Sequence, residues 1–144
     1  MAFKTVYTAK ATVTGGRAGE GRTDDGKLEV NLDKPEALGG PAESTGTNPE
    51  QLFAIGYAAC FEGAIQAVGA DAETGDVSIT STVDLGKTAS GLGLQVTLDV
   101  SLPSLDDDLA AELVGKAHQA CPYSNATRGN IDVTLIANGR TLVG

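Results

Sequence analysis

A run of apolar residues that begins near position 49 constrains the fold more than any other feature of this sequence. Asn48, Pro49 and Glu50 are typical of a helix start, with an N-cap, a proline at the first helical position and an acidic residue near the positive end of the helix dipole. Three polar residues interrupt the apolar run before it ends at Val68, namely Gln51, Glu62 and Gln66. A helix that is apolar on nearly all sides is buried, so we predict a central helix covered by other elements.

Alternating apolar and polar residues predict strands on both sides of that helix. The predicted strands span residues 6–13, 28–32, 77–85, 94–102 and 131–135. The third and fourth are expected to be antiparallel neighbours, because a glycine-containing turn region separates them. Ser104 and Asp107 form a capping signature for a second helix, which is expected to end at Cys121 and Pro122. The order β-β-α-β-β-α-β favours the α+β class.

Length and charge limit the domain count and the partners. The 144 residues fit a single domain spanning residues 1–144. Lys and Arg number 10 against 19 Asp and Glu, and a net charge of −9 repels nucleic acid and anionic membranes. No stretch approaches the roughly 18 apolar residues of a membrane span, and the N-terminal segment has no signal-peptide core. We therefore expect a soluble, cytoplasmic protein.

The sequence has two cysteines, Cys60 and Cys121, which lie 61 positions apart. Two cysteines are too few for a disulfide framework. They are either a redox couple or two small buried hydrophobic residues. One histidine and no third cysteine disfavour zinc, so no metal site is predicted. Cys60 lies roughly 15 Å along the helix from Glu50, beyond the reach of the helix N-terminus. Burial alone would raise its pKa, so a reactive Cys60 needs a basic group from elsewhere in the chain.

Few residues could supply that activation. Arg17 lies between glycines that allow close backbone approach, although it also fits a solvated hairpin tip. Arg128 is better explained as a turn residue. His118 precedes Cys121 by three positions, so a Cys–His nucleophile pair is possible, but a histidine near a helix C-terminus is the simpler interpretation. Glu50 is either a helix-start acid or the partner that holds an arginine in place.

Four segments together resemble the organic hydroperoxide resistance (Ohr) branch of the Ohr/OsmC family. They are Thr14–Gly19, Gly46–Phe53, Gly56–Phe61 and Cys121–Ile131, and the resemblance extends over essentially the whole chain. It implies an OsmC-like fold, with antiparallel sheets around a buried central helix, in an intertwined homodimer.

The resemblance also implies a function, that of a thiol-dependent peroxidase for organic hydroperoxides. Cys60 matches the peroxidatic cysteine of the family and Cys121 the resolving cysteine, while Arg17 and Glu50 fall on its other active-site positions. No bound cofactor is implied. The external reductant would be dihydrolipoyl groups on lipoylated proteins.

Apolar residues near Cys60 favour substrates with an apolar tail. Phe53, Tyr57 and Phe61 are expected to bind alkyl or fatty-acid hydroperoxides rather than hydrogen peroxide, which has no tail to bury. Since Glu50 and Cys60 cannot touch along one helix, we predict a composite site in which Arg17 and Glu50 of one subunit lie beside Cys60 of the other. Two alternatives remain open: an apolar-ligand binding module with structural cysteines, and a hydrolase that uses Cys121 and His118.

Overall fold

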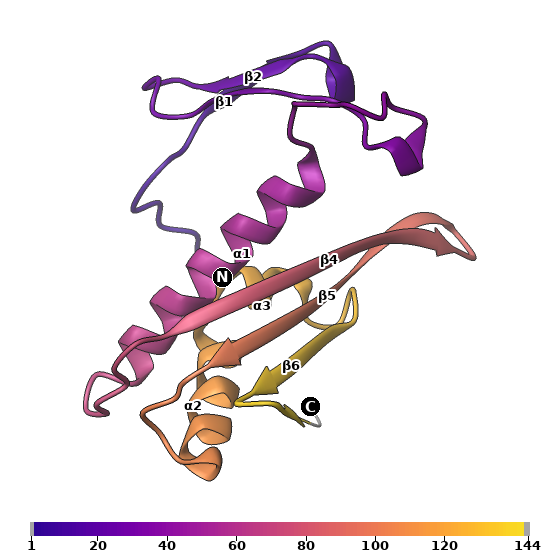
Figure 1. Cartoon of the computed structure of the whole chain (residues 1–144). Helices are drawn as coiled ribbons and strands as arrows, with labels where there is room; N and C mark the ends of the chain where they lie inside the picture. The colour runs from indigo at the N-terminus through magenta and orange to yellow at the C-terminus, as the bar shows by residue number, and fades with distance from the viewer. Residues whose placement is uncertain (1, 143–144) are drawn as a thin grey trace. The chain divides into compact units, whose positions relative to one another are not determined.

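The computed structural model describes residues 2–142 (Figure 1). Within it the chain forms two compact units, Met1–Pro49 and Glu50–Gly144. One domain spanning residues 1–144 stays a prediction. The two units differ in how much of their own surface they bury.

The first unit is a small antiparallel sheet with strand order β1-β2-β3. Its strands are β1 (Ala11–Thr14), β2 (Glu20–Thr23) and β3 (Glu29–Asn31), and 3-10 turns occupy Gly16–Ala18 and Glu36–Leu38. The expected first strand over 6–13 is wrong in its extent, because the pairing of β1 with β2 ends at Ala11 opposite Thr23, where β2 itself ends. Val6 and Tyr7 therefore precede the strand and are exposed.

The second unit combines three helices with a four-stranded sheet in the order β4-β5-β6-β7. Its elements are α1 (Pro49–Val68), β4 (Ser78–Thr88), β5 (Gly91–Ser101), α2 (Asp107–Ala120), α3 (Pro122–Thr127), β6 (Val133–Ala137) and β7 (Arg140–Leu142). The α+β prediction is confirmed, and β4 and β5 pair antiparallel as expected. The sheet is nevertheless mixed, because β5 and β6 are parallel. Parallel neighbours need a crossover connection, and α2 and α3 provide it.

One face of this sheet carries the core. On β5, Val96, Leu98 and Val100 are buried, while the alternate residues Gln95 and Asp99 are exposed. The buried side chains form one cluster with residues of both longer helices: Tyr57, Phe61 and Ile65 from α1, and Ala110, Leu113, Val114 and Ala117 from α2. The two helices therefore pack on the same face of the sheet, as Figure 1 shows.

In the single chain, helix α1 is buried along one of its own faces. Its buried residues are Tyr57, Phe61, Ala64 and Ile65, while Ile55 is 69% exposed. The prediction of a helix buried on nearly all sides is confirmed for that one face only, because the core cluster meets the helix from one side. Among residues 2–142, no helix combines the length and the apolar character required to cross a bilayer.

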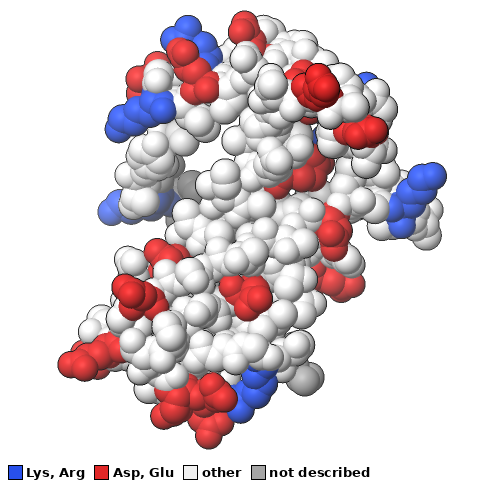
Figure 2. Space-filling view, viewed as in Figure 1, with Lys and Arg blue, Asp and Glu red and all other residues white. Residues whose placement is uncertain are grey.

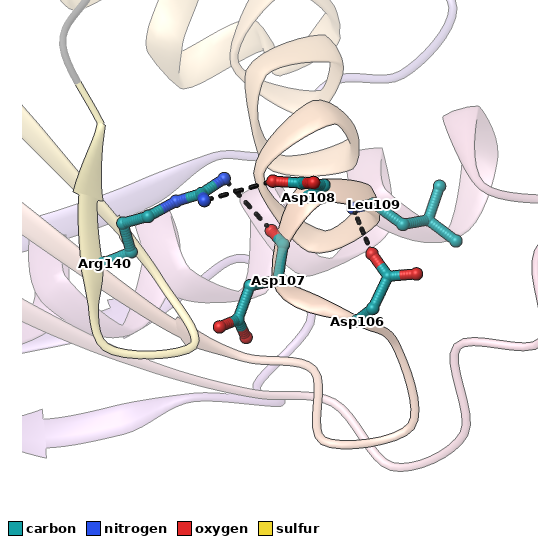
Figure 3. Close-up of polar contacts among 5 residues, drawn as sticks. All are labelled: Asp106, Asp107, Asp108, Leu109 and Arg140. Atoms are coloured by element: carbon teal, nitrogen blue, oxygen red, sulfur yellow. Dashed lines mark hydrogen bonds and ion pairs between the residues drawn. The ribbon is translucent and has the colours of Figure 1, made fainter.

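Helix α2 begins two residues later than the expected capping signature. Asp106, not Ser104, is the N-cap, and its carboxylate accepts a hydrogen bond of 2.8 Å from the Leu109 backbone N–H. The Arg140 guanidinium on β7 donates to the Asp108 carboxylate at 3.2 Å and to the backbone carbonyl of Asp107 at 3.3 Å (Figure 3). These contacts fasten β7 to the start of α2, where acidic side chains gather on the surface (Figure 2).

Candidate active site

The two thiols meet inside the second unit. Cys60 lies on α1 and Cys121 between α2 and α3, and their sulfur atoms are 3.5 Å apart. Both are free cysteines, with Cys60 half-buried and Cys121 fully buried. The packing of the crossover against α1 thus brings together residues that the sequence separates by 61 positions.

Cys121 occupies a sharp corner that its neighbours in the sequence create. Its backbone N–H still donates to the Ala117 carbonyl at 2.8 Å, which closes the last turn of α2. Pro122 follows and disfavours helical geometry at Cys121, whose ψ is 124°. The same proline suits the first position of the next helix, so α3 begins at once. The sequence prediction ended the second helix correctly at this point but missed α3.

The surroundings of Cys60 favour its protonated form. Burial raises the pKa of the Cys60 thiol, and the adjacent Cys121 raises it further, while a hydrogen bond from the Tyr123 backbone lowers it. The net direction is upward. A thiolate is the reactive form, so a reactive Cys60 requires an additional positive charge or hydrogen-bond donor.

An aromatic cluster flanks the thiols. The ring centroids of Phe53, Tyr57 and Tyr123 lie 5.7 to 5.9 Å from one another. Of the three predicted substrate-binding residues, Tyr57 and Phe61 are fully buried in the core, and Phe53 alone keeps exposed surface. Tyr123, stacked on Phe53 and 39% exposed, was missed as a candidate although it lies in the Cys121–Ile131 segment.

Polar groups link α1 to the crossover beside the sulfur atoms. The Tyr57 hydroxyl lies 2.8 Å from the Ser124 hydroxyl and 3.1 Å from that of Thr127. His118 Nδ1 lies 2.8 Å from the same Ser124 hydroxyl. Nδ1 of His118 is therefore hydrogen-bonded to Ser124 and not to Cys121, which does not support a Cys121–His118 nucleophile pair. Ser124 is itself fully buried, which closes it to substrates as a nucleophile.

His118 favours its neutral form. Burial lowers its pKa, and the positive charge of Arg128 lowers it further. Arg128 also donates from its guanidinium to the His118 carbonyl and to the Asn125 side chain, the latter at 2.9 Å. Arg128 therefore fastens the end of α3 to α2 and is more than an isolated turn residue.

Arg17 is built into the turn between β1 and β2. Gly15 and Gly16 have φ of 79° and 59°, a region that favours glycine. At Gly19, a Cβ would lie 1.7 Å from the Thr14 carbonyl oxygen, so only glycine fits the chain's return. This turn holds Arg17 half-buried at its centre.

Glu50 and Cys60 lie on one continuous helix and do not meet. Glu50 is half-buried in the first turn of α1, and the ten-residue interval to Cys60 corresponds to roughly 15 Å. Arg17 and Cys60 belong to different units, so their shared site stays a prediction. Among residues 2–142, no group of three or more His, Cys, Asp or Glu side chains could hold a metal ion.

Comparison with known proteins shows to which family this chain belongs. The family model described as OsmC-like protein matches residues 40–136. An organic hydroperoxide resistance protein of Xanthomonas axonopodis pv. citri is 54% identical over 135 residues, which cover 92% of this chain and 94% of that protein. The chain belongs to the OsmC-like family, in its organic hydroperoxide resistance branch.

Solved structures of OsmC-like proteins agree with the fold. The organic hydroperoxide resistance protein OhrB of Bacillus subtilis is 49% identical and superposes with a TM-score of 0.84, covering 92% of this chain and 98% of that one. A similar protein from Elizabethkingia anophelis, with thiocyanate bound, has 46% identity and a TM-score of 0.88, covering 94% and 99% of the two chains. The OsmC-like fold expected from the sequence segments is therefore confirmed.

Proposed function

We propose that this chain is a thiol-dependent peroxidase that reduces organic hydroperoxides to alcohols. The Cys60 thiolate attacks the peroxide O–O bond, taking one oxygen as sulfenic acid, and the alkoxide leaves as the alcohol after gaining a proton. The Cys121 sulfur then attacks the Cys60 sulfur, the S–O bond breaks, and water leaves with the thiol proton. The product is a Cys60–Cys121 disulfide.

The observation that carries this proposal is the 3.5 Å separation of the two sulfur atoms. A disulfide has an S–S distance of about 2.05 Å, so a small closing movement suffices to form one. Related proteins bear the name organic hydroperoxide resistance protein, which supports an organic hydroperoxide as the oxidant.

Arg17 and Glu50 supply the electrostatic part of the proposed site. The raised pKa of Cys60 calls for a cation beside its sulfur, and Arg17 would fill that role. Glu50 would hold the guanidinium in place by a bidentate pair. Because Glu50 and Cys60 are separated along α1, a homodimer with composite sites accounts for all these roles, and the exposed Ile55 side of α1 offers apolar surface for a partner subunit.

The composite arrangement is tested with a mixed dimer of an Arg17→Ala chain and a Cys60→Ser chain. If each site combines Arg17 of one subunit with Cys60 of the other, the mixed dimer holds one intact site and one doubly damaged site. We expect about half of wild-type activity per dimer. A mixed dimer no more active than an Arg17→Ala dimer would overturn the composite site.

Substrates with apolar tails and a dithiol reductant complete the proposal. Phe53 and Tyr123 form a partly exposed aromatic wall that suits an alkyl or fatty-acid chain, whereas Tyr57 and Phe61 would support it from within the core. Dihydrolipoyl groups on lipoylated proteins would reduce the disulfide by two successive exchanges. Turnover with dihydrolipoamide against turnover with glutathione, each with cumene hydroperoxide, tests this choice of reductant.

Intact mass and thiol counting before and after one equivalent of cumene hydroperoxide test the peroxidase itself. Wild type should lose both thiols with a two-proton mass decrease, while Cys121→Ser should gain one oxygen atom at Cys60. If both thiols persist in wild type, the peroxidase proposal fails. The competing function is then an apolar-ligand binding module, which the full burial of Cys121 in the core favours.

A further inference from the structure

The two cysteines are flanked by members of one hydrogen-bonded group. Tyr57 precedes Cys60 by three positions on α1. His118 precedes Cys121 by three positions, and Ser124 follows it by three. The contacts from the Tyr57 hydroxyl through Ser124 to His118 therefore join the same elements that carry the two thiols, alongside the contact between the sulfur atoms.

The number of hydrogens that the group can donate determines which atom is donor and which is acceptor in each hydrogen bond. Each hydroxyl has one hydrogen to donate, and the Thr127 hydroxyl donates its hydrogen to the Ser124 carbonyl at 3.2 Å. Its oxygen then accepts from Tyr57, the Tyr57 oxygen accepts from Ser124, and the Ser124 oxygen accepts from His118 Nδ1. The reverse order would leave out the bond to the Ser124 carbonyl. The order with the most hydrogen bonds thus requires a hydrogen on Nδ1 of neutral His118.

Burial makes the group costly to disturb. The Tyr57 and Ser124 side chains are fully buried, and Thr127 is 7% exposed. A buried hydroxyl without a partner is destabilising, and hydrogen bonds in a low-dielectric interior reinforce one another. A chain in which every hydroxyl both donates and accepts therefore holds the crossover at a fixed distance from α1.

We propose that His118, Ser124, Tyr57 and Thr127 are positioning residues that hold Cys121 at attacking distance from Cys60 and so set the rate of disulfide formation. The 3.5 Å sulfur separation falls at the limit of the range of about 3–3.5 Å for reacting atoms held ready to react. This role rests on the proposed function for its place in the cycle. The geometry it describes is a property of the thiol pair, which permits a test without peroxide.

The test uses dithiobis(nitrobenzoate) and stopped-flow absorbance. The half-exposed Cys60 displaces a first thionitrobenzoate and retains a second in a mixed disulfide. The Cys121 sulfur then attacks the Cys60 sulfur, releasing that second thionitrobenzoate and forming the protein disulfide. We expect the second step to slow about tenfold to hundredfold in Ser124→Ala and Tyr57→Phe, since small misplacements have effects of this size, while the first step changes less than about twofold.

Two controls separate positioning from loss of stability. Val114→Ala removes buried core volume from α2 without removing any member of the hydrogen-bonded group and should leave the second step unchanged. His118→Asn keeps an N–H donor near the position of Nδ1 and should restore most of the rate lost in His118→Ala. An unchanged second step in both Ser124→Ala and Tyr57→Phe would overturn the proposal.

The direction of the chain has its own test. His118 is the single histidine of the protein, so its two ring nitrogens can be assigned without ambiguity by ¹⁵N NMR. At neutral pH we expect a protonated Nδ1 and an unprotonated Nε2, and the opposite tautomer would overturn the direction. If wild type forms the disulfide with the nitrobenzoate reagent but not with cumene hydroperoxide, the peroxidase proposal fails while the positioning role stands.

Discussion

The two units of this protein bury their side chains to very different extents. Among residues 2–49, only Gly21 and Leu32 are buried. The second unit has a core of its own that joins α1, α2 and the sheet, and both thiols lie in or against it. A unit with so little buried surface cannot be stabilised by its own core. The thiol pair is thus built into a self-supporting unit, whereas Arg17 lies on a sheet that needs contacts beyond itself.

The largest expected effect comes from replacing either of the two thiols of the second unit, and the two replacements should differ in outcome. Cys60→Ser should abolish hydroperoxide reduction, because the remaining thiol, Cys121, is fully buried and out of reach of the peroxide. Cys121→Ser should still consume about one equivalent of peroxide per chain and then stop, since the sulfenic acid has no resolving thiol. Peroxide consumption under single-turnover and steady-state conditions distinguishes them. Sustained turnover by Cys60→Ser would contradict the proposed chemistry.

Arg17 tests whether the first unit contributes to chemistry. Loss of one group that stabilises a charged reactant typically costs about a hundredfold, and we expect that decrease in the rate of Cys60 oxidation for Arg17→Ala. Arg22→Ala is a matched control, because Arg22 is an exposed cation of the same sheet. The rate is measured by competition against a reference thiol. Equal rates in Arg17→Ala and wild type would confine the reaction to the second unit.

Core substitutions sharpen the contrast in burial. Leu98→Ala should lower the free energy of unfolding by about 2–5 kcal/mol, because Leu98 is fully buried on β5. Val13→Ala, in β1, should change it by less than about 0.5 kcal/mol, because Val13 is 55% exposed in the single chain. Urea denaturation measures both. A large loss for Val13→Ala would mean that the assembled protein covers that strand.

Two glycines of α1 provide a smaller and more local comparison. Gly63→Ala should stabilise the protein by about 0.5–1 kcal/mol, because alanine favours helices and a Cβ there meets nothing within 4 Å. At Gly56 a Cβ would lie 3.1 Å from the Tyr123 hydroxyl oxygen, so Gly56→Ala should gain less. Thermal unfolding of both variants measures the difference. A loss at Gly63 would place that face of α1 in an interface.

The smallest expected effect is the pH dependence contributed by His118. Because its pKa is lowered in the folded protein, the unfolded chain binds more protons in the window just below the ordinary histidine pKa. Stability should therefore fall as the pH drops through that window. NMR titration should give a higher His118 pKa in Arg128→Gln. Arg140→Gln is the control. Arg140 is a cation that lines a surface groove together with Glu112 and His118, but it is not among the causes of the lowered His118 pKa.

Side-chain periodicity made the longer elements predictable. The helix expected to run to Val68 and the two long strands after it were found with small shifts at their ends, because each has a sustained apolar pattern. Strand β2, with the sequence Glu-Gly-Arg-Thr, has no such pattern and was missed. Its place in the sheet comes from pairing with both neighbours, which a local pattern does not encode.

The candidate site was predictable only in part. Cys60, Cys121, Arg17 and Glu50 stand out as candidates from the sequence itself, but their roles come from the resemblance of whole segments, since a separation of 61 positions carries no distance information. Ser124 and Thr127 were not singled out, because a hydroxyl in a short helix has no signature until its partner on α1 is known. The apolar ring of Tyr57 predicts a role in substrate binding, which stays a prediction, and nothing in the sequence indicates that its buried hydroxyl links α1 to the crossover.

The two sulfur atoms differ in exposure, and this difference determines which of them can exchange electrons with molecules from solution. Cys60 is half-buried and Cys121 is fully enclosed, so a reagent from solution reaches only the first. In the proposed cycle a reducing thiol must attack the Cys60 sulfur of the disulfide, and Cys121 is the leaving group. Oxidant and reductant then use one entrance in turn. Cys121 then reacts with the Cys60 sulfur alone, and the two thiols together hold the electron pair that the peroxide removes and the reductant restores.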